Sequence, residues 1–424
     1  MSQAPAQPRD PLGLTMLVAV AFAALCSIRL TVLTAPYFDE VHYLPAAREM
    51  LAGGEYTNRE HPLLGKTILA AGIALFGDAP FGWRLFPLLA GVLALVASMR
   101  AIWHASHSRF ATLAFGILLA SGFMLLVQAR IAMLDIFMAC FLALATWQFT
   151  AAIRKPEQGR ARLAATGLFL GAAMAAKWNA IPLAMLPGIA FFLARLSAGR
   201  RRFFSSRRGI PVPGVSLVEA ALWLGAIPLA AYALSFWPAL FLQDNPLASG
   251  GLVAFHREML GLQTQVLAPH SYQSNWPDWV LNARAIWYYY EAVDGVQRGV
   301  LLLGNPLTML LGIPALFWCL ASGISERNWA RIGMVTGYLS SLGLWFVAEK
   351  SMQFYYHYFV PHFFLLGVLA LALDALWQAG YRRLPLSVLG GSLALFAWFY
   401  PVLTSAALTE PMSFLDYAWL NGWR

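Results

Sequence analysis

Residues 36–66, PYFDEVHYLPAAREMLAGGEYTNREHPLLGK, form the stretch around which the rest of the chain is organised. They follow the first long apolar segment and carry an adjacent acidic pair, Asp39 and Glu40, together with two histidines and several cations. Polar side chains next to hydrocarbon are costly, so such a cluster is more often functional than accidental. The sequence therefore places its candidate functional site in this loop.

The composition predicts a membrane protein. Of the 424 residues, 59% are hydrophobic and 12% are charged, and the mean hydropathy is +0.61. A soluble protein carries about twice this charged fraction, so we expect an all-α, polytopic integral membrane protein. A net charge of +9 is compatible with nucleic-acid binding. The basic residues, however, lie in short connections between apolar segments, so we expect no nucleic-acid partner.

The apolar segments suffice for eleven transmembrane helices, because a membrane-spanning helix needs about 20 apolar residues. The expected spans lie near residues 12–33, 82–103, 110–128, 131–152, 163–177, 180–197, 216–240, 300–321, 330–348, 355–377 and 385–406. The apolar piece 63–76 is shorter and is predicted to form an interfacial or re-entrant helix. We expect residues 1–424 to form a single transmembrane domain.

The distribution of Lys and Arg predicts the orientation. More than half of the 29 fall in connections that share one side if the N-terminus is cytoplasmic, such as residues 199–209, GRRRFFSSRRG. This distribution follows the positive-inside rule. Two large loops, about 34–81 and 241–299, then lie on the extracytoplasmic side, and the active site is expected to face outward.

Asp39 has two interpretations. It precedes the segment VHYLPAAREML, so its carboxylate is a candidate N-cap that accepts backbone N–H groups. A cap does not explain the neighbouring Glu40 or the cations that follow in the loop. A carboxylate at a membrane interface, with a cation near it, is equally suited to act as a general base.

Cations at the outer ends of the spans suggest an anion site. His61 and Lys66 lie in HPLLGK, where Pro62 suits the first turn of a helix, and a helix N-terminus beside a lysine favours an anion. The alternative is a lysine that extends to the interface from a short helix. Arg29 leaves the first span and Arg84 enters the second on the same side. Each is a candidate ligand for a lipid-linked phosphate, or else a structural partner of the acidic pair.

Further polar and aromatic residues are candidates for binding. Arg130 and Asp135 are five residues apart, so they do not share a helix face. Lys177 closes a small-residue run that permits close helix packing. The loop 241–299 is rich in Trp, Tyr, Asn and Gln, which either bind sugar rings or form an interfacial belt. The histidines are too scattered to predict a metal site.

Seven segments, in this order, resemble the protein O-mannosyltransferase family. They are RLTVLTAPYFDEVHY (29–43), HPLLGK (61–66), GWRLFPLLAG (82–91), ARIAMLDIFM (129–138), AAKW (175–178), the block HSYQSNWPDW…IWYYY…GNP (270–306) and FYYHYFVPHFF (354–364). The resemblance implies a membrane glycosyltransferase of the C-type (GT-C) fold that uses a polyprenyl-phosphate sugar. It extends over about residues 29–365, most of the chain.

The resemblance also implies roles for individual residues. Asp39, in the family's FDE motif, is implied as the general base that deprotonates an acceptor hydroxyl, and Glu40 as a residue that positions donor or acceptor. The transfer would invert the anomeric carbon and need no metal or other cofactor. The residues implied in binding the donor phosphate and its lipid carrier are Arg29, His61, Lys66, Arg84 and Arg130. The candidates for sugar or acceptor binding are Asp135, Lys177, His270, Ser274, Trp276, Trp279 and His357.

Two departures from the family pattern affect the interpretation. Leu63 replaces the second proline of HPPLGK, and the loop 241–299 has no room for the β-trefoil that eukaryotic members insert there. The chain thus resembles the compact bacterial form, and we expect a multi-pass protein of the bacterial cytoplasmic membrane. Its expected partners are membrane lipids, a polyprenyl-phosphate sugar and an acceptor protein. The sequence carries no signal for an oligomeric state.

Two alternatives remain. A transferase of the same fold would glycosylate a lipid or a surface glycan instead of a protein, as the related aminoarabinose transferases do. A member of another class would be a transporter or lipid flippase, and transporters often contain internal repeats. We find no such repeat in this sequence.

Overall fold

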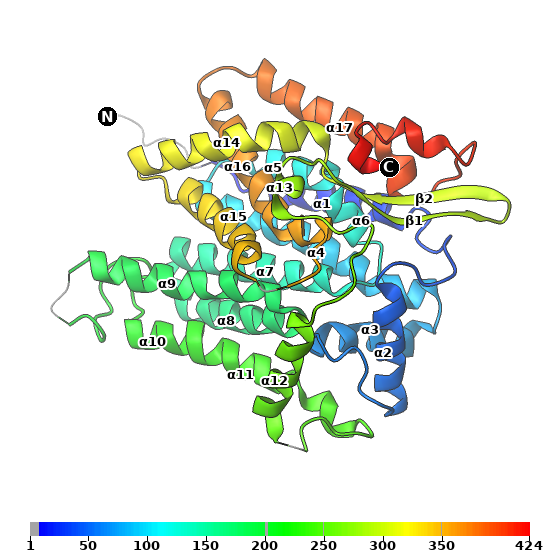
Figure 1. Ribbon diagram of the computed structural model, residues 1–424. Coiled ribbons are helices and arrows are strands. Elements are labelled where there is room, and N and C mark those ends of the chain that lie inside the picture. Colours follow the sequence, from blue (N-terminus) through cyan, green and yellow to red (C-terminus); the bar gives the residue numbers. More distant parts are fainter. Residues whose placement is uncertain (1–7, 200–201, 249, 349) are drawn as a thin grey trace.

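The fold is a bundle of helices to which a β-hairpin is attached (Figure 1). The computed structural model describes residues 8–199, 202–248, 250–348 and 350–424. The helices before the hairpin are α1 (Leu12–Ser27), α2 (Glu40–Ala52), α3 (Leu64–Phe76), α4 (Pro80–Ser106), α5 (Arg109–Ser121), α6 (Met124–Gln128), α7 (Leu134–Arg154), α8 (Gly159–Ala176), α9 (Ile181–Ser197), α10 (Leu217–Ala221), α11 (Ile227–Leu234), α12 (Gly251–Thr264) and α13 (Trp276–Val280). The hairpin and the helices after it are β1 (Ile286–Val293), β2 (Val296–Leu302), α14 (Pro306–Ser325), α15 (Trp329–Val347), α16 (Phe359–Gln378) and α17 (Arg383–Leu403).

Each of the eleven predicted spans overlaps with a helix or with consecutive helices. Within the described residues, seven helical segments are long and apolar enough to cross a membrane: Pro80–Ser106, Leu134–Arg154, Trp178–Ser197, Leu217–Phe241, Pro306–Ser325, Tyr355–Gln378 and Arg383–Leu403. The apolar helices α1, α3 and α5 are shorter. A multi-pass helical membrane protein is therefore confirmed, whereas the number eleven is not.

Two of the predicted spans are shorter in the structure for a local reason. Arg29, just after α1, has a φ of 59°, and Phe123, just after α5, has a φ of 74°. A residue in this left-handed region cannot continue a right-handed helix. The sequence pattern of apolar residues does not reveal these breaks.

α7 lies at the centre of the bundle, between α4 and α8. Residues 121–140, which lead into α7 and form its first turns, are all buried. Asp135 is the charged residue of the segment 131–140. A carboxylate at such a depth is costly unless it is paired, so the fold requires a cation beside the start of α7.

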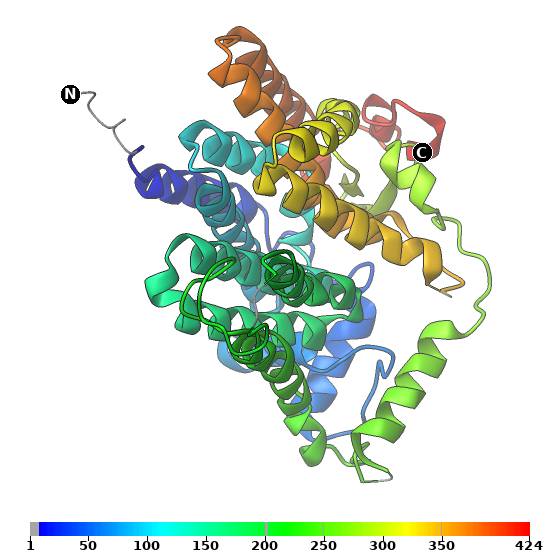
Figure 2. The ribbon, with the colours of Figure 1, turned by 90° about the vertical axis from the view of Figure 1, so that its left-hand side faces the viewer.

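The loops gather at the two ends of the bundle. The connection between α9 and α10 lies at one end, on the left in Figure 1, whereas α2, α3 and the hairpin lie at the other. Figure 2 shows that the connection from α12 to α13 passes along one side of the molecule. Arg200 and Arg201 of the cationic connection lie outside the described residues. The arrangement agrees with the predicted topology, and the assignment of one end to the cytoplasm stays a prediction.

The hairpin corrects the expectation of an all-α fold. β1 and β2 pair in antiparallel fashion, from Ile286 opposite Leu302 to Val293 opposite Val296. The turn residues 294 and 295, an Asp-Gly pair, have φ values of 51° and 75°. Both values are those of a two-residue type I′ turn, which Asp-Gly favours. Because strands occupy residues 286–302, the helix expected from residue 300 begins later, at residue 306.

Candidate active site

Asp39 occupies the N-cap position of α2, yet its carboxylate makes no capping hydrogen bond. Its Oδ2 accepts a hydrogen bond from the hydroxyl of Tyr43 at 3.4 Å, one turn along the helix. The interpretation of this carboxylate as a helix cap is therefore wrong, although the residue does stand at the cap position. Asp39 is half-buried.

The backbone before Asp39 is held in an uncommon conformation. Phe38 has a φ of 50°, a left-handed value that costs a non-glycine residue roughly 1–3 kcal/mol. Its ring stacks on Tyr288 of β1 with the centroids 3.9 Å apart and meets Tyr356 edge-on at 5.9 Å. Two segments far along the chain thus clamp Phe38 and fix the position of the neighbouring carboxylate.

Asp39 also has a perturbed acidity. Burial raises the pKa of its carboxyl above the usual value, Lys177 counteracts this rise, and the negative charge of Asp135 adds to it. A carboxylate with a raised pKa is a stronger base, as long as it is ionised at the working pH. The environment of Asp39 therefore suits proton abstraction better than that of an exposed aspartate.

Asp135 and Lys177 form a buried ion pair. Lys177 Nζ donates to Asp135 Oδ2 at 2.7 Å, and each side chain is only 2% exposed. Lys177 also lies over the ring of Tyr356, 5.1 Å from its centroid. The pair supplies the cation that the carboxylate on α7 requires. The two residues belong to separate motifs in the sequence, and the fold brings them together near Asp39.

A small pocket opens beside this ion pair. Its lining includes Asp135, Asn179, Ser341, Trp345, Tyr356 and His357. His357 is 4% exposed, and its Nε2 has no hydrogen-bond partner among the described residues. A buried polar atom without a partner is unusual and indicates an interaction with a ligand or water. A ligand rich in hydroxyl groups would find donors, acceptors and aromatic faces in this pocket.

Glu40 and Arg84 form a second buried ion pair. Arg84 Nε and Nη2 donate to the two Glu40 oxygens at 2.9 and 2.8 Å, and its Nη1 donates to two carbonyls of the segment between α1 and α2. The Glu40 carboxylate also accepts the backbone N–H groups of Tyr37 and Ala132. The side chains of Arg84 and Glu40 are 1% and 0% exposed. This geometry supports the structural alternative for both residues and not the expected contacts with donor or acceptor.

Lys66 is also fully buried, and it closes the loop that precedes α3. Its Nζ donates to the carbonyls of Asn58 and His61 at 2.7 and 3.0 Å and to the hydroxyl of Tyr56 at 3.3 Å. Burial lowers the pKa of Lys66 to about 7. His61 is buried as well, with its ring 5.9 Å from that of Tyr43, and burial lowers the pKa of its imidazole. These contacts make Lys66 a brace of the loop rather than a ligand at its surface.

Arg29 and Arg130 meet at the end of α17. Arg29 donates to the carbonyl and the hydroxyl of Thr404 at 3.2 and 2.6 Å. Arg130 donates to the same carbonyl at 3.4 Å and to the carbonyls of Cys26 and Ile28. The two arginines thus tie the end of α1 to the end of α17. Their expected contact with the donor phosphate stays a prediction.

The candidates in the outer loop fall into two groups. Trp279 is fully buried, its indole N–H donates to Ser274 Oγ at 2.9 Å, and its ring meets Trp345 edge-on at 5.8 Å. Trp276 and His270 are exposed. The first group stabilises the loop, and only the second group presents side chains to a substrate.

Lys350 is a charged residue that the sequence analysis did not single out. It lies between α15 and α16, and the charges of Lys177, Asp135 and Asp39 all act on it. Burial lowers the pKa of its ammonium group to about 8. Its signal in the sequence is weak, because it is a single cation that belongs to no recognised motif.

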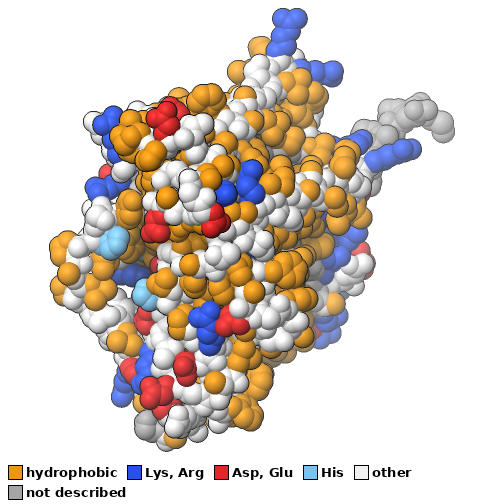
Figure 3. Space-filling model, turned by 90° about the vertical axis from the view of Figure 1, so that its right-hand side faces the viewer, with side chains coloured by type: hydrophobic (Ala, Val, Ile, Leu, Met, Phe, Trp, Pro, Cys, Tyr) orange, Lys and Arg blue, Asp and Glu red, His pale blue; other side chains and the backbone are white. Residues whose placement is uncertain are grey.

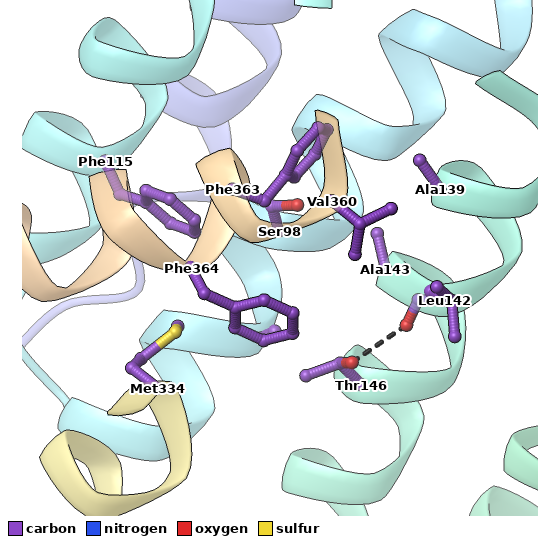
Figure 4. A pocket seen from close by; sticks show the side chains of 11 residues that line it. Ser98, Phe115, Ala139, Leu142, Ala143, Thr146, Met334, Val360, Phe363 and Phe364 are labelled. Atoms are coloured by element: carbon purple, nitrogen blue, oxygen red, sulfur yellow. Dashed lines mark hydrogen bonds between the residues drawn. The ribbon is translucent and has the colours of Figure 1, made fainter. Parts of the chain in front are cut away.

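Three other observations define the limits of the site. Histidine and charged side chains gather around a hollow on the face shown in Figure 3. A larger cavity lies between α4, α5, α7, α15 and α16 (Figure 4), but none of the side chains that line it is titratable, so we assign no chemistry to it. Among the residues that the structure describes, no group of three or more His, Cys, Asp or Glu side chains is placed to hold a metal ion.

Residues 60–240 match the family model described as dolichyl-phosphate-mannose-protein mannosyltransferase. The chain is 28% identical to the polyprenol-phosphate-mannose–protein mannosyltransferase of Mycobacterium tuberculosis, over 97% of this chain and 91% of the relative. It is 26% identical to the Corynebacterium glutamicum protein of the same name, over 92% of this chain and 88% of the relative.

Two solved structures are similar in fold. A chain of the Saccharomyces cerevisiae Pmt1-Pmt2 complex bound to the sugar donor superimposes with a TM-score of 0.78 at 14% identity, over 100% of this chain and 96% of that chain. ArnT from Cupriavidus metallidurans, bound to undecaprenyl phosphate, gives a TM-score of 0.56 at 18% identity, over 86% of this chain and 61% of that chain. The chain therefore has the GT-C architecture of these membrane glycosyltransferases, and over residues 60–240 it resembles the protein O-mannosyltransferase family.

Proposed function

We propose that this protein transfers a mannosyl residue from a polyprenyl-phosphate donor to an acceptor hydroxyl, with Asp39 as the general base. The observation that carries this proposal is the Asp39 carboxylate, which caps no helix although it stands at a cap position. It is fixed through Phe38 and lies near the pocket of Asp135 and His357. The relatives from Mycobacterium tuberculosis and Corynebacterium glutamicum are named for this transfer, which supports the choice of donor.

The reaction is a single inverting displacement. The acceptor O–H gives its proton to an Asp39 oxygen, and the acceptor oxygen forms a bond to the anomeric carbon of the sugar. The bond from that carbon to the phosphate oxygen breaks, and its electron pair leaves with the phosphate. The protein contributes orientation and electrostatic stabilisation. One base suffices, because a phosphate leaving group needs no second carboxylic acid of the kind that glycosidases use.

The buried residues around Asp39 support this chemistry indirectly. The Glu40–Arg84 pair fixes the segment before α2. In the Asp135–Lys177 pair beside the pocket, the two opposite charges neutralise each other. We place the sugar in the pocket lined by Asp135, Asn179 and His357. In our proposal the site opens to the periplasmic side of the bacterial cytoplasmic membrane, since the Arg-rich connections lie at the opposite end of the bundle.

A second candidate function keeps the donor and changes the acceptor. The fold similarity to ArnT, at a TM-score of 0.56, makes a lipid or surface-glycan acceptor the main rival to a protein acceptor. A transporter receives no support from the relatives named above, which are transferases.

The test is transfer of label from polyprenyl-phosphate-[14C]mannose by the purified protein, with a Ser/Thr-rich peptide and a lipid extract as separate acceptors. We expect label in the peptide with the wild type and none with Asp39→Asn, which keeps the size of the side chain and removes the base. Asp294→Asn, at the exposed turn of the hairpin, is the matched control and should transfer normally because Asn tolerates the same left-handed turn conformation. Normal turnover by Asp39→Asn would refute the assignment of the base. Label in lipid alone would favour the second candidate.

A further inference from the structure

The hairpin has two outer edges, and the chain itself covers one of them. In a hairpin with a two-residue turn, residue pairs that exchange hydrogen bonds alternate with pairs whose N–H and C=O groups point outward. Counted from the turn, the first outward-pointing pair is Ala292 opposite Gln297. The next is Tyr290 opposite Gly299. The Leu408 N–H donates to the Gln297 carbonyl at 2.9 Å, which agrees with this count and covers the edge of β2 there.

The outer edge of β1 is open. Among the described residues, the main-chain groups of Tyr290 and Ala292 that point away from β2 make no hydrogen bond. Ala292 and Glu291 are exposed, and Tyr290 is half-buried. Residues 289–293 also lack the proline and lysine with which proteins commonly protect a free strand edge. Such an edge is a template for another extended chain.

This open edge leads to the candidate base. Tyr289 meets Tyr37 edge-on, with the ring centroids 5.9 Å apart. Tyr288 stacks on Phe38, the residue before Asp39. Tyr288 has no partner in the register of β2, because it is the extra residue of a β-bulge, and bulges next to active sites commonly redirect a side chain. The open edge begins two residues beyond Tyr288, or about 7 Å along the strand.

We propose that the open edge of β1 binds the acceptor polypeptide as an added strand and thereby brings a Ser or Thr hydroxyl to Asp39. This inference rests on the proposed function, to which it adds the form in which the acceptor is recognised. The N–H and C=O groups of Tyr290 and Ala292 pair with main-chain groups that every polypeptide offers. An acceptor residue about two to four positions further along the added strand reaches Phe38 and the Asp39 carboxylate. A lipid acceptor has no main chain to pair with the edge, so this feature favours a protein acceptor.

The first experiment uses the wild-type protein and changes only the acceptor. A short peptide with a single Thr at its centre is N-methylated at one position at a time, which deletes one main-chain N–H. In a strand, only every second residue points its N–H toward a given neighbour. On one side of the Thr, KM for the peptide should therefore rise by about fivefold at alternate positions and change little at the positions between them. An unchanged KM, or a rise without this alternation, would refute pairing along an edge.

The second experiment changes the edge itself. Proline lacks the N–H and is tolerated in an edge strand where the N–H points outward. Ala292→Pro should raise KM for the peptide by about fivefold and leave KM for the donor unchanged. Gln297→Pro is the matched control, because it deletes the outward N–H directly opposite and keeps the carbonyl that binds Leu408. It should keep the wild-type KM for the peptide, and an equal rise in both variants would contradict the inference.

The outcomes separate this inference from the proposed function. If the wild type transfers the sugar to the peptide but neither Ala292→Pro nor N-methylation changes KM, the binding edge is refuted and the proposed function stands. If label enters lipid alone, the inference is refuted and the second candidate function is favoured. If the wild type transfers to neither acceptor, both are refuted. If the wild type is a dimer that Ala292→Pro dissociates, a second copy of this chain occupies the edge and the inference is overturned.

Discussion

Arg84→Met tests whether the arginine of the GWRLFP segment supports the fold or binds the donor. The guanidinium makes four hydrogen bonds, two to Glu40 and two to the carbonyls of Leu30 and Leu33, and it is 1% exposed. Methionine has a similar length and fills most of the space, so the cavity term stays small. The substitution therefore removes mainly the charge and the hydrogen bonds.

The expected loss of stability follows from these contacts. Removing one partner of a buried ion pair costs about 3–5 kcal/mol, and the lower end applies here because two backbone N–H groups still bind the Glu40 carboxylate. The two carbonyls that lose their donor add about 1 kcal/mol each. We expect Arg84→Met to lower the free energy of unfolding by about 5 kcal/mol in total.

The assay is thermal or denaturant unfolding of the purified variants in one detergent. Arg84→Met combined with Glu40→Gln should regain about 2 kcal/mol, because the second substitution removes the unpaired buried charge and keeps an acceptor for a backbone N–H. Arg48→Met is the matched control. Its bidentate pair with Asp78 lies on the surface, with side chains 37% and 46% exposed, and such pairs contribute about 0–1 kcal/mol.

The reasoning would be refuted by an Arg84→Met protein that unfolds like the wild type but binds polyprenyl phosphate weakly. That result would indicate that Arg84 binds the donor phosphate and does not support the fold. Failure of Glu40→Gln to rescue any stability would separately show that the ion pair is not the source of the loss.

Three further predictions concern the site. Burial raises the pKa of the Asp39 carboxyl. On acidification, kcat/KM should therefore begin to fall at a pH above the usual aspartate pKa of about 3.9, where an unperturbed carboxylate is still ionised. A fall in kcat/KM that begins only at or below that pH would contradict the assignment of Asp39 as the base. Lys177→Met leaves the Asp135 carboxylate buried without its cation and should cost about 3–5 kcal/mol of stability, partly restored by Asp135→Asn, as unfolding measurements can check. Transfer should persist in EDTA, and complete loss with rescue by a divalent ion would overturn the metal-free mechanism.

The hairpin and the ion pairs show why part of this protein escapes prediction. The helices were predictable because their apolar residues repeat locally along the chain, and the predicted ends differ from the observed ones mostly by a few residues. The hairpin was missed although residues 294 and 295 carry the Asp-Gly turn signal, because its strands merge with the apolar run that leads into α14. Glu40 and Arg84 are 44 residues apart, and no local pattern tells a structural pair from two substrate ligands.

By itself, the sequence determined the class of protein, indicated a family resemblance and singled out Asp39 as the candidate base, because hydropathy and the FDE segment are read directly along the chain. Only the tertiary structure showed which partner each buried charge has. A buried charge must be neutralised by whatever lies beside it, and that neighbour depends on how α4, α7, α8 and the segment after α15 pack. Packing bound Arg84 to Glu40 and Lys66 to the oxygens of its own loop, and it paired Lys177 with Asp135.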